Sequence, residues 1–211
     1  MAVIRFMAWG LGFAFRSLFR GVYVDERSVL RLREALGRRS GALVLLPTHK
    51  SHIDYLLLSY LAFGYALPLP HTAAGENLSV PLVGLLLKGC GAFYIPRNLK
   101  GTQGQRRREE LQSYVACLLR QGRVLEFFPE GGRARHGGVL SARPGMLGMV
   151  VDVAHDLDQR DPLVTCATVD YELLAPTEAE GFARELLGQK KKKESLLSVS
   201  RAVLRALLPS S

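Results

Sequence analysis

Short apolar runs of strand length alternate with amphipathic segments of helix length, and this alternation restricts the possible folds more than any other feature of the chain. Residues 42–47, ALVLLP, form a continuous apolar run that is typical of a strand buried on both faces. Strands that alternate with helices predict an α/β domain whose largely parallel, mixed sheet is flanked by helices. The expected strands fall within residues 42–47, 71–91, 91–98, 123–135 and 162–174, and the expected helices within residues 25–39, 53–66, 71–91, 101–122, 144–157 and 190–208.

Composition and charge restrict the partners of such a domain. With 211 residues, of which 48% are hydrophobic, the chain is large enough for one core, and we assign residues 25–211 to a single domain. A net charge of +9 favours anionic partners such as nucleic acid, anionic lipid or phosphorylated small molecules. A nucleic-acid binder is disfavoured, because the sequence contains no RNP-type aromatic motif, zinc finger or recognition-helix pattern.

The three cysteines, Cys90, Cys117 and Cys166, show neither C-x-x-C nor zinc-site spacing. Free cysteine usually behaves as a small hydrophobic residue. We therefore expect three buried thiols in a reducing compartment.

Residues 1–24 form a separate, basic and aromatic-rich segment. The ten uncharged residues between Arg5 and Arg16 are too few to span a bilayer, which takes about 20. On a helix, Arg5, Arg16 and Arg20 share one sector, and aromatic and aliphatic residues occupy the rest of the circumference. This pattern predicts an amphipathic helix in an anionic membrane interface; the alternative is a helix that packs against the core. The basic run Lys190–Lys193 could add attraction to the same surface or be a solvated loop.

Polar clusters follow three of the expected strands. They are His49–Asp54, Arg97 and Glu130–Arg135. Open α/β sheets bind ligands outside the carboxyl ends of their strands, so we expect these clusters to meet at one cleft.

His49 is the candidate general base of this cleft, because imidazole titrates near neutral pH. If His49 lies in the loop and Asp54 in the first helical turn, Asp54 can orient the ring and stabilise the imidazolium. The alternative is a simple helix start, where an aspartate is favoured in any case. No G-x-S-x-G nucleophile elbow is present, so the nucleophile would be a hydroxyl of the substrate. Lys50 and Ser51, between the two residues, are further candidates for substrate contact.

The cluster Glu130–Arg135, within the stretch FFPEGGRAR, has the composition of an anion site. Gly131 and Gly132 would let backbone N–H groups approach an anion closely. Arg133 and Arg135 can form paired hydrogen bonds to phosphate oxygens, and Arg97 offers a third guanidinium. The alternative for each arginine is a solvated surface position.

The motifs H-x-x-x-x-D, GAFYIPR and FPEGGRAR, in this order, resemble the glycerolipid acyltransferase family. The stretches HKSHIDYLLLSYL, AAGENLSVP and LLGQKKKKESLLSVSRAVLRAL resemble its glycerol-3-phosphate acyltransferases, especially the mitochondrial type, with dihydroxyacetone-phosphate acyltransferases as close relatives. The resemblance extends over roughly residues 5–208.

This resemblance implies an acyl-CoA-dependent O-acyltransferase that makes lysophosphatidate from glycerol 3-phosphate, without metal or redox cofactor. A dihydroxyacetone-phosphate or lysophospholipid acceptor is the alternative. Membrane association is also implied and, in a eukaryotic cell, the mitochondrial outer membrane. The residues that match the family's blocks are His49 and Asp54 for catalysis; Gly91, Phe93 and Arg97 in the second block; Glu130, Gly131, Arg133 and Arg135 for the acceptor phosphate; and LVTCATVDYE for acyl-CoA.

Three residues depart from the family's pattern. Pro96 replaces a common second arginine, Ala134 a common serine, and Cys166 the usual proline. Pro96 and Ala134 predict a weaker hold on the phosphate, and Cys166 makes the placement of the acyl chain less certain. Pro96 and Cys166 leave open a catalytically weak, membrane-binding homologue.

Overall fold

The protein is described here from a computed structural model, which covers residues 2–38, 41–79, 83–96, 100–134, 138–156 and 161–172, together with residues 179, 182–184 and 186–189. Within these residues five strands form a sheet in the order β3-β2-β4-β1-β5. Every strand pair in this part of the chain is parallel. The strands are β1 (Leu43–Pro47), β2 (His71–Gly75), β3 (Phe93–Ile95), β4 (Val124–Glu126) and β5 (Leu163–Ala167). The expected α/β class with a largely parallel sheet is confirmed.

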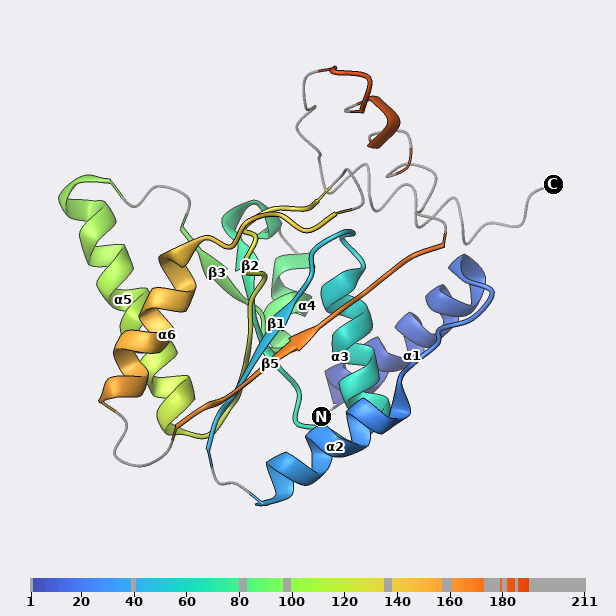
Figure 1. Cartoon of the computed structure of the whole chain (residues 1–211), viewed down its shortest axis with the longest axis horizontal. Coiled ribbons are helices and arrows are strands. Elements are labelled where there is room, and N and C mark those ends of the chain that lie inside the picture. The colour runs from blue at the N-terminus through green and yellow to red at the C-terminus, as the bar shows by residue number, and fades with distance from the viewer. Residues whose placement is uncertain are drawn as a thin grey trace.

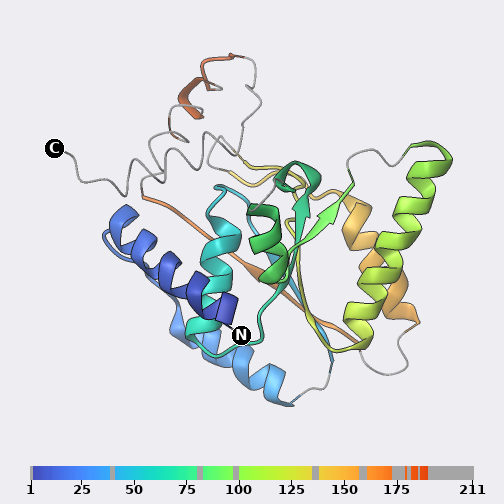
Figure 2. The ribbon, with the colours of Figure 1, turned by 180° about the vertical axis from the view of Figure 1, so that it is seen from behind.

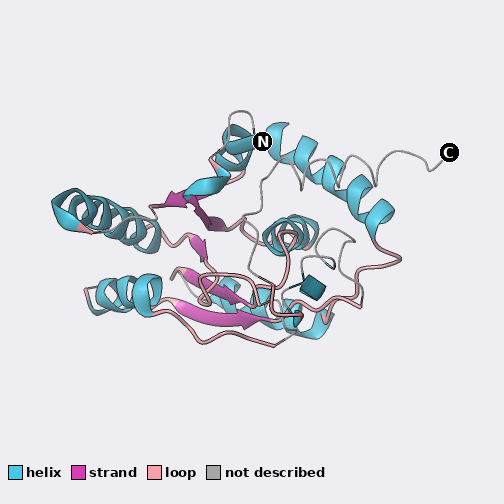
Figure 3. Cartoon of the chain, turned by 90° about the horizontal axis from the view of Figure 1, so that it is seen from above, coloured by secondary structure: helices cyan, strands magenta, loops and turns pink. Residues whose placement is uncertain are grey.

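Helices cover both faces of the sheet, so that the domain has three layers (Figures 1 and 3). Helices α5 (Gly101–Arg120) and α6 (Pro144–His155) lie on one face. Helices α3 (Asp54–Gly64) and α4 (Val83–Gly89) lie on the other. Outside them, α1 (Ala2–Leu18) packs against α3 and α4 (Figure 2). The remaining helices are α2 (Glu26–Arg38) and the short 3-10 helix η1 (Glu76–Leu78).

The main core lies between the sheet and the layer of α5 and α6. Leu125 of β4 and Phe127, two residues later, are buried there against Val115 and Met149. Each fully buried side chain of this kind contributes about 1.5–3 kcal/mol of transfer free energy. The two-residue period of a strand directs Glu126, between them, to the opposite face of the sheet, toward α3.

The sheet opens between β2 and β4 at their carboxyl ends. The two strands pair at His71 and Thr72, opposite Leu125 and Glu126. Beyond this point β2 continues beside β3, whereas the chain after β4 stays beside β1: the N–H of Phe127 donates to the carbonyl of Leu45 in β1, at 3.2 Å. A crevice at the carboxyl edge of a parallel sheet is the usual place for a ligand site in such folds.

The expectation of three buried thiols is wrong. Cys117 and Cys166 are exposed, and Cys90 is half-buried. Cys166 lies on β5, the edge strand, where Val164 on the same side of the strand is also exposed. An edge strand is less completely covered by its neighbours, so its alternate residues reach solvent.

The N-terminal helix serves the core with one side only. Phe15 of α1 is buried against Leu57 and Val169, whereas Phe6, Trp9 and Phe13 are exposed by 63%, 69% and 51%. Among the described residues, no helix is both long and apolar enough to cross a membrane. The expected helix at 190–208 and the basic run Lys190–Lys193 lie outside the described residues.

Candidate active site

His49 and Asp54 meet at the junction between β1 and α3, as the sequence predicted. β1 ends at Pro47 and α3 begins at Asp54, so the intervening loop turns the chain back on itself. Nδ1 of His49 lies 2.9 Å from Oδ2 of Asp54. Asp54 is fully buried, whereas His49 lines a pocket at this edge of the sheet.

The other partners of Asp54 decide which nitrogen of His49 carries the proton. Oδ2 also accepts the N–H groups of Lys50 and Ser51, at 2.8 and 2.9 Å. Oδ1 accepts the hydroxyl of Tyr171 at 2.6 Å. A carboxyl group surrounded by donors is an ionised acceptor, so Nδ1 of His49 must donate to it. Nε2 is then the unprotonated nitrogen, as a general base requires.

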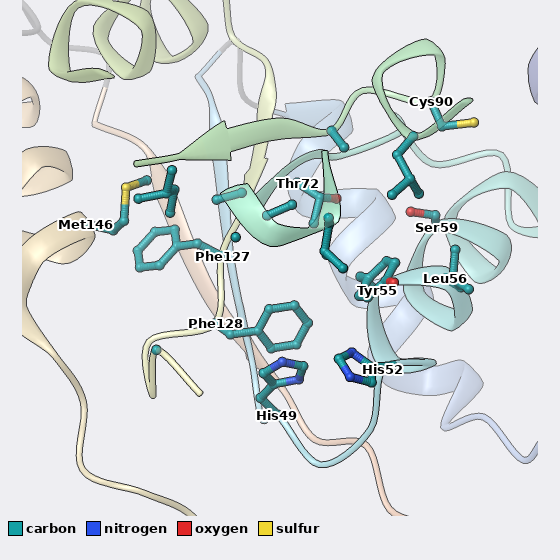
Figure 4. Close-up of a pocket in the computed structure, with 18 of the residues that line it drawn as sticks. His49, His52, Tyr55, Leu56, Ser59, Thr72, Cys90, Phe127, Phe128 and Met146 are labelled. Atoms are coloured by element: carbon teal, nitrogen blue, oxygen red, sulfur yellow. The ribbon is translucent and has the colours of Figure 1, made fainter. Parts of the chain in front are cut away.

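The loop after β4 supports His49 from the other side. The His49 ring stacks on Phe128, with 4.0 Å between the ring centroids and 30° between the planes (Figure 4). The carbonyl of His49 accepts the N–H of Ala134 at 2.7 Å. The small, buried side chain of Ala134 allows this close approach of the two backbones. Ring and backbone of His49 are therefore both fixed.

Glu130 has a different task from the expected phosphate contact. Its side chain is buried, Oε1 accepts the N–H of His49 at 2.8 Å, and Oε2 accepts the N–H of Leu140 at 2.7 Å. Glu130 does not line the pocket, and a carboxylate would in any case repel a phosphate. The prediction that Glu130 binds the acceptor is replaced by a structural role: Glu130 ties the loop after β4 to the loop after β1.

A pocket of about 1140 Å³ opens beside His49 and contains both polar and apolar walls. Figure 4 shows His49, Phe128 and His52 on one side of the space, with Met146 toward one end and Cys90 toward the other. Gly131, Gly132 and Arg133 line the same pocket, and their predicted contact with a phosphate stays a prediction. Arg97 and Arg135 lie outside the described residues. From the second block, Pro96 lines the pocket, whereas Gly91 and Phe93 do not.

Gly131 is required for its backbone conformation rather than for a free N–H. Its φ is +63°, a conformation that disfavours other residues. Its N–H donates to the carbonyl of Phe128 at 3.0 Å, so the group is not available to an anion. The expectation that this N–H binds phosphate is therefore wrong.

Lys50 and Ser51 face other parts of the protein. The ammonium group of Lys50 pairs with the carboxylate of Asp170. Ser51 is buried, and its hydroxyl accepts the N–H of Ile53 at 3.1 Å. Neither side chain lines the pocket, so the predicted contact with substrate has no geometric support.

A family model described as Acyltransferase matches residues 27–169, which include the His49–Asp54 pair, Arg133 and every described strand. The chain belongs to the acyltransferase family.

The chain is similar to two groups of relatives that are named glycerol-3-phosphate acyltransferases. Mitochondrial glycerol-3-phosphate acyltransferase 1 of Bos taurus is 36% identical over 210 residues, which cover 98% of this chain and 25% of the relative. A glycerol-3-phosphate acyltransferase of Xylella fastidiosa (strain M23) is 43% identical over 157 residues, covering 74% of this chain and 18% of the relative. The chain thus spans a quarter or less of these relatives. The resemblance to this family is confirmed.

A solved structure of the 1-acyl-sn-glycerophosphate (LPA) acyltransferase PlsC from Thermotoga maritima is also similar to the chain. The match covers 100% of this chain and 95% of the other, at 15% identity and a TM-score of 0.41.

Sequence reasoning missed two groups in the site of this acyltransferase, Tyr171 and Glu126. Tyr171 lies within the quoted fourth block, but its bond to Asp54, 117 positions away, is visible only in the fold. Glu126 is fully buried, and within the described structure neither carboxyl oxygen has a hydrogen-bond partner. A charged residue inside the apolar run VLEFF was the available signal.

The environment of Glu126 keeps its carboxyl group protonated at neutral pH. Burial raises its pKa from 4.5 to about 8, and the charge of Asp54 acts in the same direction. The neighbouring Thr72 hydroxyl offsets part of this rise without reaching hydrogen-bond geometry. A neutral acid beneath the ionised Asp54 avoids two adjacent buried negative charges.

Proposed function

We propose that this domain is an acyl-CoA-dependent O-acyltransferase that converts glycerol 3-phosphate to lysophosphatidate. One observation carries the proposal: the base His49, the cation Arg133 and a long apolar wall share one pocket. The similarity to glycerol-3-phosphate acyltransferases supports the choice of acceptor.

In the proposed reaction Nε2 of His49 removes the proton from the sn-1 hydroxyl of glycerol 3-phosphate. The oxygen attacks the thioester carbonyl carbon, forming the ester C–O bond, and the C–S bond breaks. The imidazolium, stabilised by Asp54, returns the proton to the departing thiolate of coenzyme A. Holding the hydroxyl by its phosphate lowers the entropic part of the barrier.

The apolar part of the pocket suits the acyl chain. It passes from the site toward α1, α3 and α4, and aliphatic and aromatic side chains supply most of its lining. Burying a methylene group in such a space contributes about 0.8 kcal/mol, so a long chain binds favourably. The lining residues from these helices include Ile4, Met7, Leu11, Leu56, Phe63 and Leu87.

The exposed side of α1 supports attachment to a membrane surface. Phe6, Trp9 and Phe13 project from the molecule on the helix whose opposite side lines the acyl pocket. Arg5 and Arg16 are also exposed and would meet anionic head groups. An interfacial α1 would bring the pocket to the layer where long-chain substrates collect. The mitochondrial outer membrane, in a eukaryotic cell, stays a prediction based on the mitochondrial relatives.

The proposed function is tested by transfer from palmitoyl-CoA to a panel of acceptors: glycerol 3-phosphate, dihydroxyacetone phosphate, lysophosphatidate and glycerol. We expect lysophosphatidate from glycerol 3-phosphate, and a loss of about 10³-fold or more in kcat for His49→Ala. A preference for dihydroxyacetone phosphate or lysophosphatidate would reassign the acceptor. Transfer by His49→Ala within tenfold of the wild-type rate would reject the mechanism.

A further inference from the structure

Arg143 lies over the glycine turn beside the candidate base, although no sequence motif pointed to it. A Cβ atom added to Gly131 would stand 2.7 Å from Cδ and 3.2 Å from Nε of Arg143. These separations are closer than normal contacts, so the arginine side chain occupies the space that a larger residue at 131 would take. Glycine at 131 therefore serves the arginine as well as the turn.

The backbone of Arg143 is fixed to the same loop. Its N–H donates to the carbonyl of Pro129 at 2.8 Å, one residue before Glu130. Glu130 in turn accepts the N–H groups of His49 and Leu140. Hydrogen bonds between the loop after β1 and the loop after β4 thus connect Arg143 to His49.

Arg143 is an exposed residue at the rim of the pocket, and its charge has no counter-ion in the described part of the protein. There its side chain forms no ion pair or hydrogen bond, and the first turn of α6, which follows it, contains no acidic residue. In contrast, Arg106 of α5 pairs with Glu110 at 3.2 Å. Arg143 lines the pocket together with His49 and Arg133. Two guanidinium groups that line the same pocket as the base favour an anionic ligand there.

We infer that Arg143 binds a phosphate group of the substrate together with Arg133, and that Gly131 keeps the space open for it. The inference rests on the proposed function for the identity of the substrate. The planar guanidinium offers two parallel N–H donors to phosphate oxygens, which a lysine cannot match. Both the acceptor and the nucleotide part of acyl-CoA carry a phosphate group. We assign Arg143 to the phosphate of the acceptor, because hydrogen bonds connect the loop that leads to Arg143 with the loop of the base His49.

The first test needs no turnover. Thermal unfolding of the whole chain is measured with and without inorganic phosphate and glycerol 3-phosphate, for wild type, Arg143→Gln, Arg143→Lys and the control Arg120→Gln. Arg120 is exposed at the end of α5, outside the pocket. We expect both ligands to raise the Tm of wild type and of Arg120→Gln, and to have little effect on Arg143→Gln. The absence of a shift in wild type, or an equal shift in Arg143→Gln, would overturn the inference.

The second test identifies the source of the phosphate. For Arg143→Gln we expect a KM for glycerol 3-phosphate raised about tenfold to a hundredfold, with the KM for palmitoyl-CoA within twofold of wild type. Palmitoyl-pantetheine lacks the phosphate groups of coenzyme A. If Arg143→Gln raises the KM for palmitoyl-CoA but not for palmitoyl-pantetheine, Arg143 contacts coenzyme A instead of the acceptor. Unchanged KM values for all three substrates would again reject the phosphate contact. If wild type transfers no acyl group to any acceptor, the proposed function fails, and the Tm shifts still decide on Arg143.

The third test concerns Gly131. Gly131→Ala should lose the phosphate-dependent Tm shift, because the added methyl displaces the guanidinium. Combined with Arg143→Gln it should cause no further loss of that shift, since both changes remove one contact. Additive losses would show that Gly131 does not act through Arg143.

Discussion

The backbone N–H of His49 donates to Oε1 of Glu130, 81 positions later in the chain, at 2.8 Å. This bond joins the loop after β1 to the loop after β4, two adjacent strands of the sheet. The second oxygen of Glu130 holds Leu140 at 2.7 Å. One buried carboxylate thus fixes the base and the segment that leads to Arg143.

Glu130→Gln should damage catalysis more than acceptor binding. The amide NH₂ would face a backbone N–H of either His49 or Leu140, leaving a buried donor without an acceptor. We expect a loss of about 1–3 kcal/mol in the free energy of unfolding and a clear fall in kcat. Urea denaturation and steady-state kinetics measure the two effects, with the exposed Glu110→Gln as control. A higher acceptor KM at unchanged kcat would instead favour a direct phosphate contact.

Tyr171→Phe should slow the reaction modestly without unfolding the protein. The hydroxyl of Tyr171 donates to Oδ1 of Asp54 at 2.6 Å and helps to hold the carboxylate toward His49. We expect kcat to fall about threefold to tenfold and KM to change little. Asp54→Asn, which upsets the tautomer of His49, should cost about 10³–10⁴ in kcat. Tyr114→Phe on α5 is the matched control, and an equal effect there would disprove a specific role for Tyr171.

Glu126→Gln should stabilise the protein at alkaline pH and not at acidic pH. Because the folded pKa of about 8 exceeds the ordinary 4.5, the folded state keeps a proton that the unfolded chain releases. The free energy of unfolding of the wild type therefore falls as pH rises from 4.5 to 8, and the loss caused by Glu126 stays constant above that range. Each pH unit in this window adds about 1.4 kcal/mol to the penalty, so the advantage of glutamine reaches a few kcal/mol. Urea denaturation at pH 5, 7 and 9 measures it; an advantage independent of pH would contradict the neutral-acid assignment.

Replacing the exposed aromatic residues of α1 should weaken membrane binding. Phe6, Trp9 and Phe13 are mostly exposed, so their change to glutamine removes apolar surface without opening the core. We expect affinity for anionic vesicles to fall at least about tenfold, whereas Val151→Gln, on α6 at the far side of the molecule, has no effect. If the variant with all three aromatic residues replaced sediments with the vesicles as efficiently as Val151→Gln, α1 does not face the membrane.

The sequence by itself determined the elements whose signal is local. Alternating apolar runs and amphipathic segments predicted the strands and helices. A strand buried on both faces gives a short continuous apolar run, whereas a helix buried on one side gives an apolar residue every three to four positions. The His49–Asp54 pair was also predictable. Its two members lie five positions apart at a strand-to-helix junction, where the loop alone can bring them together.

Only the tertiary structure decided which distant groups meet. Glu130 supports His49, Tyr171 holds Asp54, and Arg143 lies over Gly131. Glu130 and Tyr171 follow β4 and β5, which became neighbours of β1 only through the strand order β3-β2-β4-β1-β5. Hydrophobic periodicity shows which residues are buried but contains no information on strand order or register. The same strand order places Cys166 on the edge strand β5, where it is exposed. The apolar character of cysteine predicted burial and contains no information on this position.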